Sequence, residues 1–392
     1  LAVDDPVFVR QCDREVRDEL GGVDQVLDFS FFMPTEILHG PEVVKRHAKR
    51  LKEFGRKALL VTGRNSARRS GAQEDVTAAL EHCGIAYEVF DQVENNPTLE
   101  NIAEGGRAAR QFAPDFVIGI GGGSPLDAAK AIAVLAVNSF GPEKLYDGDY
   151  TNRPLPVVAV PTTAGTGSEV TQYSILTLTN KQTKAGFGDR SLFPRLAFLD
   201  YRYTESLELE VTRNTAVDAL SHLIEAYLSR RAGDFSDILV EAGLRLWSRA
   251  LPDLKSAAFS SGMRDSLLAA STFGGMAIAH TGTTVVHALG YPLTYFHDIP
   301  HGRANGLLLA EYLRYNLQHA KSRVGKILKT LNLKDIGEFK ELMRFLLPCD
   351  LRLTAEQISE YGIAASRTKN ASHTLGEVSS QTCIDILQSS LG

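Results

Sequence analysis

The first half of the chain alternates short apolar runs, rich in β-branched residues, with stretches of helical spacing. The runs are KALLVTG (57–63), AYEVFD (86–91), DFVIGIGGGS (115–124) and LPVVAVPTTAGTGS (155–168), and helical patterns such as PLDAAKAIAVLAV lie between them. Strands separated by helices of this length form βαβ units, which build a parallel sheet. The pattern therefore predicts an α/β domain.

From Tyr203 onward the strand signal disappears. NTAVDALSHLIEAYLSRRA and MRDSLLAASTFGGMAIAH carry apolar residues at helical spacing. A single hydrophobic core stops growing at roughly 250 to 300 residues, and this chain has 392. We predict an α/β domain with a parallel sheet over residues 1–202, an all-helical domain over 203–392, and a site in the cleft between them.

Charge and hydropathy exclude two classes of partner. The formal net charge is −5 and no Lys/Arg cluster is interleaved with aromatic residues, so a nucleic-acid partner is not expected. No apolar run reaches the ~18 to 20 residues of a membrane span, and the N-terminal LAVDDPVFVRQCDRE is too charged for a signal peptide. Cys12, Cys83, Cys349 and Cys383 are scattered, which is typical of reduced thiols in a cytoplasmic protein.

The third run leads into three glycines, Gly121 to Gly123, at the predicted start of a helix. We expect Ser124 to be the N-cap and Asp127 to complete a capping box. Glycine lets the backbone approach an anion, and the free N–H groups of a helix start stabilise a phosphate. A tight turn that needs glycine geometry explains the same residues, so this turn alone leaves phosphate binding open.

A second turn, PTTAGTGSEVT, follows the fourth run and offers hydroxyl groups from Thr162, Thr163 and Thr166. Open α/β sheets bind ligands at the carboxyl ends of their strands, and both turns lie at such ends. Together the two turns favour a dinucleotide cofactor.

The end of the first run bears on which dinucleotide binds. It reads Gly63, Arg64, Asn65, without the acidic residue that would bind a ribose 2′-hydroxyl. Glycine leaves room, and arginine supplies charge, for a 2′-phosphate. These residues favour NADP(H) over NAD(H).

Asp218 and His222 are four residues apart, so on a helix both side chains project from one face. With His287 and His301 they supply three imidazoles and one carboxylate, which suit a divalent first-row metal. An ordinary helix-surface pair and a hydrogen-bonded core histidine would explain the same residues. Spacing alone leaves both interpretations open.

Four motifs taken together resemble those of the iron-containing (group III) alcohol dehydrogenases, a branch of the dehydroquinate synthase-like superfamily. The motifs are GGGSPLDAAKAIA, PTTAGTGSEVT, VDALSHLIEAYLS and HALGYPL…HDIPHG, and the resemblance covers essentially the whole chain from FFMPTEILHG at 31–40. It implies a dinucleotide-binding α/β domain, a helical domain, and a cleft metal, Fe²⁺ or Zn²⁺. The implied ligands are Asp218, His222, His287 and His301.

The resemblance also assigns cofactor contacts. These fall on Asn96, Gly122, Gly123, Ser124, Asp127, Thr162, Thr163, Thr166 and Lys184. Many NAD-using members carry Asp where this chain has Gly63, and glycine there is similar to the members that prefer NADP.

Tyr291 is a departure from the family pattern, because several members have a further histidine at this position beside the substrate. We expect Tyr291 or His297 to take over its part in proton transfer. Phe273, Tyr291 and Phe296 are the expected lining of an apolar substrate pocket.

The predicted function is a metal-dependent alcohol dehydrogenase or aldehyde reductase that transfers hydride between an alcohol carbon and a nicotinamide, with the metal polarising the substrate oxygen. One alternative is a lyase similar to dehydroquinate synthase, which needs several cations near the ligands, where only Arg303 is found. The other is a non-catalytic nucleotide-binding protein, which would lack a ligand. A homodimer through an exposed strand edge near the N-terminus is a further expectation.

Overall fold

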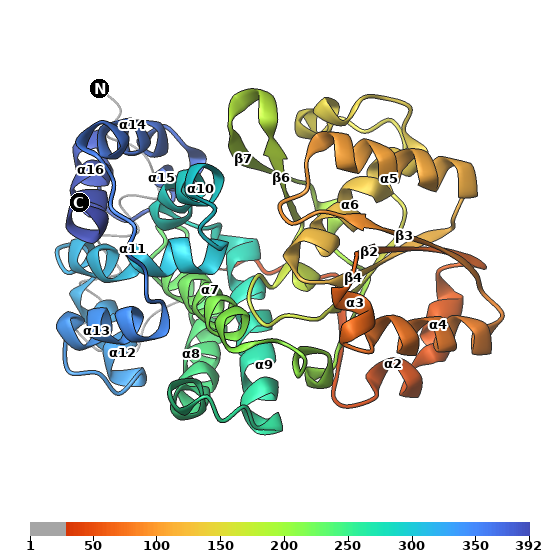
Figure 1. Cartoon of the computed structure of the whole chain (residues 1–392), viewed down its shortest axis with the longest axis horizontal. Coiled ribbons are helices and arrows are strands. Elements are labelled where there is room, and N and C mark those ends of the chain that lie inside the picture. The colour runs from red at the N-terminus through yellow and green to blue at the C-terminus, as the bar shows by residue number, and fades with distance from the viewer. Residues whose placement is uncertain (1–28) are drawn as a thin grey trace.

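The computed structural model describes residues 29–392, so the charged N-terminal stretch and Cys12 lie outside the described residues. Two regions lie side by side: strands with flanking helices up to about residue 200, and helices after it (Figure 1). This is the α/β and helical architecture that the sequence predicts.

A six-stranded parallel sheet forms the centre of the first region. Its order is β1 (Glu36–His39), β8 (Leu196–Leu199), β5 (Val157–Pro161), β4 (Phe116–Gly121), β2 (Lys57–Gly63), β3 (Ala86–Val93). Its helices are α2 (Val43–Arg46), α3 (Ser66–Arg69), α4 (Ala72–Cys83), α5 (Leu99–Phe112) and α6 (Gly123–Val137). The four apolar runs of the sequence are thus β2, β3, β4 and β5.

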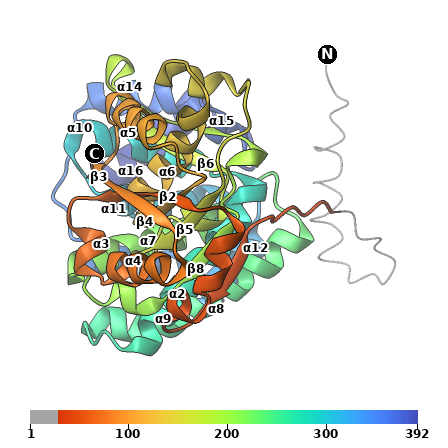
Figure 2. The same ribbon diagram turned by 90° about the vertical axis from the view of Figure 1, so that its right-hand side faces the viewer.

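Helices cover both faces of this sheet. Leu59 and Val61 of β2 pack with α5 and α6, whereas Ala58 and Leu60 pack with α2 and α4, because successive side chains of a strand point to opposite faces. Figure 2 shows α5 and α6 on one side of the strands and α2 and α4 on the other. Burial on both faces explains why the runs of β2, β4 and β5 are continuously apolar, whereas β3 at the sheet edge is partly exposed and carries Glu88 and Asp91.

The sequence patterns missed four strands. β1 and β8 have four residues each, too few to show a period. The other two, β6 (Tyr173–Leu178) and β7 (Thr183–Gly188), form a separate antiparallel hairpin. β1 lies at one edge of the sheet and pairs only with β8 among the described strands.

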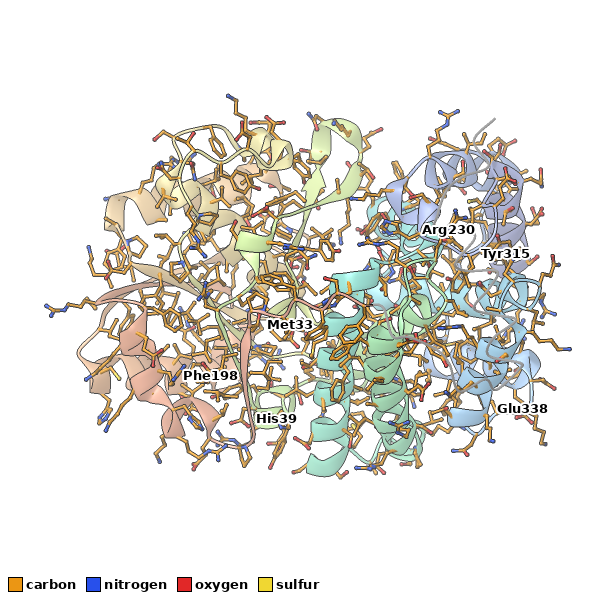
Figure 3. The ribbon with its side chains drawn as sticks, turned by 180° about the vertical axis from the view of Figure 1, so that it is seen from behind. Met33, His39, Phe198, Arg230, Tyr315 and Glu338 are labelled. Carbon is orange, nitrogen blue, oxygen red and sulfur yellow. The ribbon has the colours of Figure 1, made fainter. Side chains whose placement is uncertain are left out.

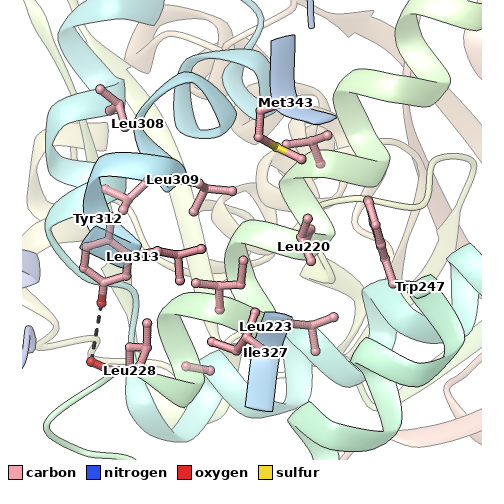
Figure 4. Close-up of a cluster of buried hydrophobic side chains, with 14 of the residues drawn as sticks. Leu220, Leu223, Leu228, Trp247, Leu308, Leu309, Tyr312, Leu313, Ile327 and Met343 are labelled. Atoms are coloured by element: carbon pink, nitrogen blue, oxygen red, sulfur yellow. Dashed lines mark hydrogen bonds between the residues drawn. The ribbon is translucent and has the colours of Figure 1, made fainter. Parts of the chain in front are cut away.

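The second region is built around α7 (Leu209–Tyr227), which is buried over most of its length. The other helices are α8 (Asp234–Ser256), α9 (Ser261–Thr281), α10 (Val285–His297), α11 (His301–Asn316), α12 (Lys321–Thr330), α13 (Ile336–Leu346), α14 (Ala355–Ser366), α15 (Lys369–Ser372) and α16 (Ser380–Leu391). Figure 4 shows the apolar side chains packed around α7, with Trp247 of α8 and Tyr312 of α11 among them. Within residues 29–392 no helix is both long and apolar enough to span a membrane.

The two regions meet at a close backbone contact. A Cβ added to Gly275 of α9 would lie 2.5 Å from the carbonyl oxygen of Gly167, and Gly167 itself has φ +61°. His39, the last residue of β1 (Figure 3), reaches the same helix, with Nε2 3.2 Å from Asp265 Oδ1. Glycine at 275 therefore sets how closely the loop after β5 approaches α9.

We predict that Gly275→Ala destabilises the fold. The added methyl group meets backbone atoms that cannot move aside, so overpacking should lower the free energy of unfolding by about 1–3 kcal/mol. Gly262→Ala is the matched control, since it lies in the same helix with no atom within 4 Å of the added Cβ. Chemical denaturation measures the stability of both variants. If the two variants are equally stable, the contact between Gly275 and Gly167 does not limit the packing.

Candidate active site

The glycine turn between β4 and α6 differs in detail from the predicted capping box. Helix α6 begins at Gly123 with Gly122 as N-cap, and Gly122 has no side chain to cap with. Gly121 has φ +149°, and a Cβ on Gly123 would lie 2.7 Å from Thr166 Cγ2. The turn therefore requires glycine both for its backbone conformation and for close packing against the second turn.

Asp127 is occupied elsewhere, so the capping-box prediction for Ser124 and Asp127 is wrong. The buried Asp127 carboxylate accepts from Ser168 Oγ (2.5 Å) and Ile175 N (3.0 Å). Beside it, the fully buried Lys130 donates to Ser168 Oγ (2.7 Å) and to the carbonyl of Tyr173 (2.7 Å). Burial lowers the pKa of Lys130 to about 8. This network joins α6 to the second turn and to the β6–β7 hairpin.

A cavity of about 740 Å³ lies at the carboxyl ends of the strands. It brings together eight of the predicted cofactor residues: Gly63, Arg64, Asn65, Gly122, Gly123, Ser124, Thr162 and Thr163. Leu207, Glu208 and Val211, at the start of the helical region, close its other side. The two turns therefore face one space, as expected for an anionic ligand at the carboxyl edge of a parallel sheet.

The remaining predicted cofactor residues, Asn96, Asp127, Thr166 and Lys184, do not line this cavity. Asn96 connects two other predicted cofactor residues, Ser124 and Lys184. Its backbone N–H donates to Ser124 Oγ (3.2 Å), and its side-chain oxygen accepts from Lys184 Nζ (2.9 Å). Burial lowers the pKa of Lys184, and the charges of Asp127 and Asp218 partly offset this. The charge of Lys184 therefore interacts both with Asp127, near the glycine turn, and with Asp218, one of the predicted metal ligands.

Three helices bring the predicted metal ligands together. Asp218 and His222 project from α7 and His287 from α10, all buried, with one ligand atom of each within 4.8 Å of the others. His301, the first residue of α11, places Nε2 3.8 Å from Asp218 Oδ1. α7 and α11 approach closely because Gly302 leaves no Cβ above the carbonyl of Asn214.

Hydrogen bonds on the outer side of two rings determine which nitrogen faces inward. His222 Nδ1 donates to the Gly165 carbonyl (3.2 Å), and His287 Nδ1 donates to Glu225. With these protons on Nδ1, each neutral ring presents an unprotonated Nε2, and the two Nε2 atoms are 3.1 Å apart. Two lone pairs at this distance repel unless a cation lies between them, so the arrangement fits a metal.

Asn305 adds to the excess of acceptors. Its Nδ2 lies 3.2 Å from Asp218 Oδ1, 3.2 Å from His287 Nε2 and 3.3 Å from His301 Nε2. One amide group has two hydrogens for these three acceptors. The cluster is therefore short of positive charge, which a divalent cation would supply.

The pKa shifts of two of the three imidazoles agree with this. Burial lowers the pKa of His222, and burial together with the charges of Lys184 and His287 holds that of His301 well below its usual value. Burial also acts to lower the pKa of His287, but the charge and hydrogen bond of Glu225 raise it overall. Because neutral imidazoles bind metals, the lowered pKa values of His222 and His301 favour binding, whereas a metal at His287 would have to compete with a proton.

Glu225 and Asn305 were not predicted from the sequence. Glu225 is fully buried, and besides His287 Nδ1 it accepts from the backbone N–H and hydroxyl of Thr284, each at 2.7 Å. Its position three residues after His222, and that of Asn305 four residues after His301, place both on the ligand faces of their helices. Helical spacing could have found both residues.

The predicted proton-transfer and substrate residues lie in different places. The Tyr291 ring stacks on His301 at 5.9 Å and meets His287 edge-on at 6.4 Å. His297 Nε2 bonds to the Tyr361 hydroxyl (3.1 Å) at the far end of α10, about 15 Å along the helix from His287 at 1.5 Å per residue.

The structure gives contacts for the other two predicted substrate-pocket residues, Phe273 and Phe296. Phe296 is 45% exposed and stacks on Tyr361, and Phe273 packs beside Gly243 of α8. These contacts do not locate a substrate pocket, so the lining by Phe273 and Phe296 stays a prediction. Tyr291 is the one member of that set that adjoins the cluster.

An open parallel sheet with a glycine turn, beside a buried cluster of imidazoles, is the arrangement of a metal-dependent dehydrogenase. The chain matches the iron-containing alcohol dehydrogenase family over residues 34–201 and the C-terminal family of Fe-containing alcohol dehydrogenases over residues 212–371. It is 30% identical to the NADPH-dependent butanol dehydrogenase of Clostridium saccharobutylicum over 359 residues, 88% of this chain and 90% of that protein.

Other relatives agree. Lactaldehyde reductase of Escherichia coli is 32% identical over 284 residues, 72% of this chain and 74% of that protein. The crystal structure of an iron-containing alcohol dehydrogenase from Thermotoga maritima is 37% identical, with a TM-score of 0.87 over 93% of this chain and all of that one.

The chain therefore belongs to the iron-containing alcohol dehydrogenase family. This confirms the predicted fold class and the predicted reaction class, the interconversion of alcohols and aldehydes with a nicotinamide cofactor and a divalent metal.

We predict that Glu225→Gln lowers metal affinity about 10- to 100-fold, the usual effect of changing a group that orients a metal-binding histidine. The amide keeps the shape of the side chain but removes the charge that holds the proton on His287 Nδ1. Chelator competition at constant pH measures the affinity, and circular dichroism checks the fold. Glu210→Gln, in the exposed first turn of the same helix, should bind metal as the wild type does. Equal affinity in both variants would contradict this role.

Proposed function

We propose that this alcohol dehydrogenase holds one divalent metal, Fe²⁺ or Zn²⁺, and prefers NADP(H) over NAD(H). The proposed ligands are Asp218, His222, His287 and His301. The observation that carries the proposal is the convergence of unprotonated imidazole nitrogens and a carboxylate in one buried cluster. Both metals accept nitrogen and oxygen ligands of this kind.

When bound, the metal supplies Lewis acidity that polarises a carbonyl oxygen or stabilises an alkoxide. The side chains around it have separate tasks. Glu225 orients His287, and the carbonyl of Gly165 orients His222. No side chain is needed as a nucleophile, since hydride transfer requires only that the carbinol carbon and the nicotinamide be held in position.

For the proton, we propose Tyr291 in place of His297. The Tyr291 ring adjoins two of the proposed ligands, His287 and His301, so its hydroxyl is the better placed to hydrogen-bond a substrate oxygen or a water. The hydrogen bond of His297 to Tyr361 instead supports a role in packing the end of α10 against α14.

The cofactor proposal places the pyrophosphate against Gly122, Gly123 and Ser124, where backbone N–H groups are free at the start of α6. Thr162 supports it, since its hydroxyl is buried and has no hydrogen-bond partner within residues 29–392. At the outer end of the cavity, Gly63 leaves space for a 2′-phosphate.

Two further proposals concern the domain boundary and the oligomeric state. A division near residue 202 is supported by the position of η6 (Tyr201–Thr204), which separates the last strand from the first long helix. A homodimer through β1 is supported by the edge position of that strand, whose outer hydrogen-bonding groups can accept another strand.

The lyase alternative lacks support at the cluster. The Arg303 guanidinium bonds to Glu210 (2.9 Å) and to Asn214 (3.3 Å), so it is already paired. A phosphorylated, carboxylated substrate would need more cations than this.

We predict that His301→Ala removes the metal and lowers kcat at least about 10³-fold, because several kcal/mol of charge stabilisation is lost. His287→Ala should do the same. Elemental analysis and steady-state kinetics with an alcohol and aldehyde panel measure both effects, and elemental analysis of the wild type distinguishes Fe from Zn. His297→Ala is the control and should keep its metal and its turnover. Wild-type turnover in a metal-free His301→Ala protein would refute the ligand assignment.

We predict that Gly63→Asp reverses the cofactor preference. A Cβ at this position meets only ordinary contacts, at 3.5 Å from the Val93 carbonyl and 3.6 Å from Ser66 Oγ, so the fold should accept it. The new carboxylate would repel a 2′-phosphate and accept a hydrogen bond from a 2′-hydroxyl, so kcat/KM for NADP relative to NAD should fall about 100-fold, or 2.7 kcal/mol.

Gly233→Asp adds the same charge at the N-cap of α8, where nothing lies within 4 Å of the added Cβ. This control should leave the ratio unchanged. A wild-type enzyme that prefers NAD would overturn the cofactor proposal itself.

A further inference from the structure

The mouth of the cofactor cavity carries one ion pair that links the two regions of the chain. Arg69, the last residue of α3, places Nη2 3.7 Å from Glu208 Oε1, and Glu208 is the N-cap residue of α7. Both side chains line the cavity and both are mostly exposed, at 63% and 78%. Because an exposed ion pair at this distance contributes little to stability, Arg69 can leave Glu208 and bind another anion instead.

The neighbouring arginines are not equivalent to Arg69. Arg68 donates to Asp91 of β3 at 2.8 Å and does not line the cavity. Arg64 lines the cavity, and within residues 29–392 it has no carboxylate within ion-pair distance. Arg69 therefore differs from both, because it faces the cavity while a carboxylate from the other side of the cleft holds it.

The charges around the cavity explain why that carboxylate matters. Four charged side chains line it, namely Arg64, Arg69, Glu94 and Glu208. The two carboxylates offset the two guanidinium groups, so an incoming phosphate of charge near −2 is attracted more strongly once Arg69 is released from Glu208 than by the unpaired Arg64 alone. Arg69 can then form a bidentate, charge-assisted hydrogen bond to that phosphate.

We propose that Arg69 exchanges Glu208 for the 2′-phosphate of NADP(H), so that Arg69 selects the phosphorylated cofactor and Glu208 competes with it. This inference rests on the proposed preference for NADP(H). Arg69 is then the cation that binds the 2′-phosphate, and Glu208 is the carboxylate that competes for Arg69 until the cofactor binds.

The test uses 2′,5′-ADP and 5′-AMP, which differ only in the 2′-phosphate, with calorimetric titration of the metal-loaded enzyme. Arg69→Ala should weaken 2′,5′-ADP binding by about 10- to 50-fold, the size expected for one charge-assisted contact. Binding of 5′-AMP should change less than about twofold. Glu208→Gln should tighten 2′,5′-ADP about two- to fivefold and leave 5′-AMP unchanged, as expected for an exposed ionic competitor.

Arg68→Ala is the matched control and should leave the ratio of the two affinities unchanged. If Arg69→Ala leaves this ratio unchanged, or if Glu208→Gln weakens 2′,5′-ADP, the exchange is refuted while the NADP preference stands. A wild type that binds 2′,5′-ADP no more tightly than 5′-AMP refutes the NADP preference, and the exchange with it. Catalytic measurements with NADPH and NADH should follow the same ratios.

Discussion

The excess of hydrogen-bond acceptors in the buried cluster of α7, α10 and α11 is the constraint on which the rest of the site depends. His222 and His287 each use Nδ1 on an outer partner, which leaves two Nε2 lone pairs 3.1 Å apart. Such an arrangement is costly in a protein interior without a cation. A bound cation would remove this cost, so metal binding would stabilise the close packing of these helices.

One loop joins this cluster to the nucleotide side. Between β5 and β6, the chain offers Thr162 and Thr163 to the cofactor cavity and the Gly165 carbonyl to His222. Gly167 then fits against α9, so the loop has little freedom to move. Because the same few residues border both proposed sites, this one segment would set the distance between a bound metal and a bound cofactor. Hydride transfer depends on such positioning.

How far the sequence predicts this structure differs from element to element. The strands β2, β4 and β5 were predictable, because burial on both sheet faces makes each a continuous apolar run, and β3 was predicted although it is partly exposed at the sheet edge. The hairpin β6–β7 was not, since it is half exposed and its pairing with the rest depends on Asp127 and Lys130. Asp127 has the spacing of a capping box, but a tertiary hydrogen bond to Ser168 takes its carboxylate. Local spacing cannot reveal a partner 41 residues away.

The same limit explains the histidines of α10. His287 and His297 lie ten residues apart in one short stretch of the sequence, but His287 contacts Glu225 of α7 whereas His297 contacts Tyr361 of α14. At the cavity mouth the charges likewise come from both regions, Arg69 from the sheet side and Glu208 from the helical side. If Arg69 binds the cofactor as proposed, both regions would set the cofactor selectivity together, because Glu208 of one region would determine how freely Arg69 of the other can bind.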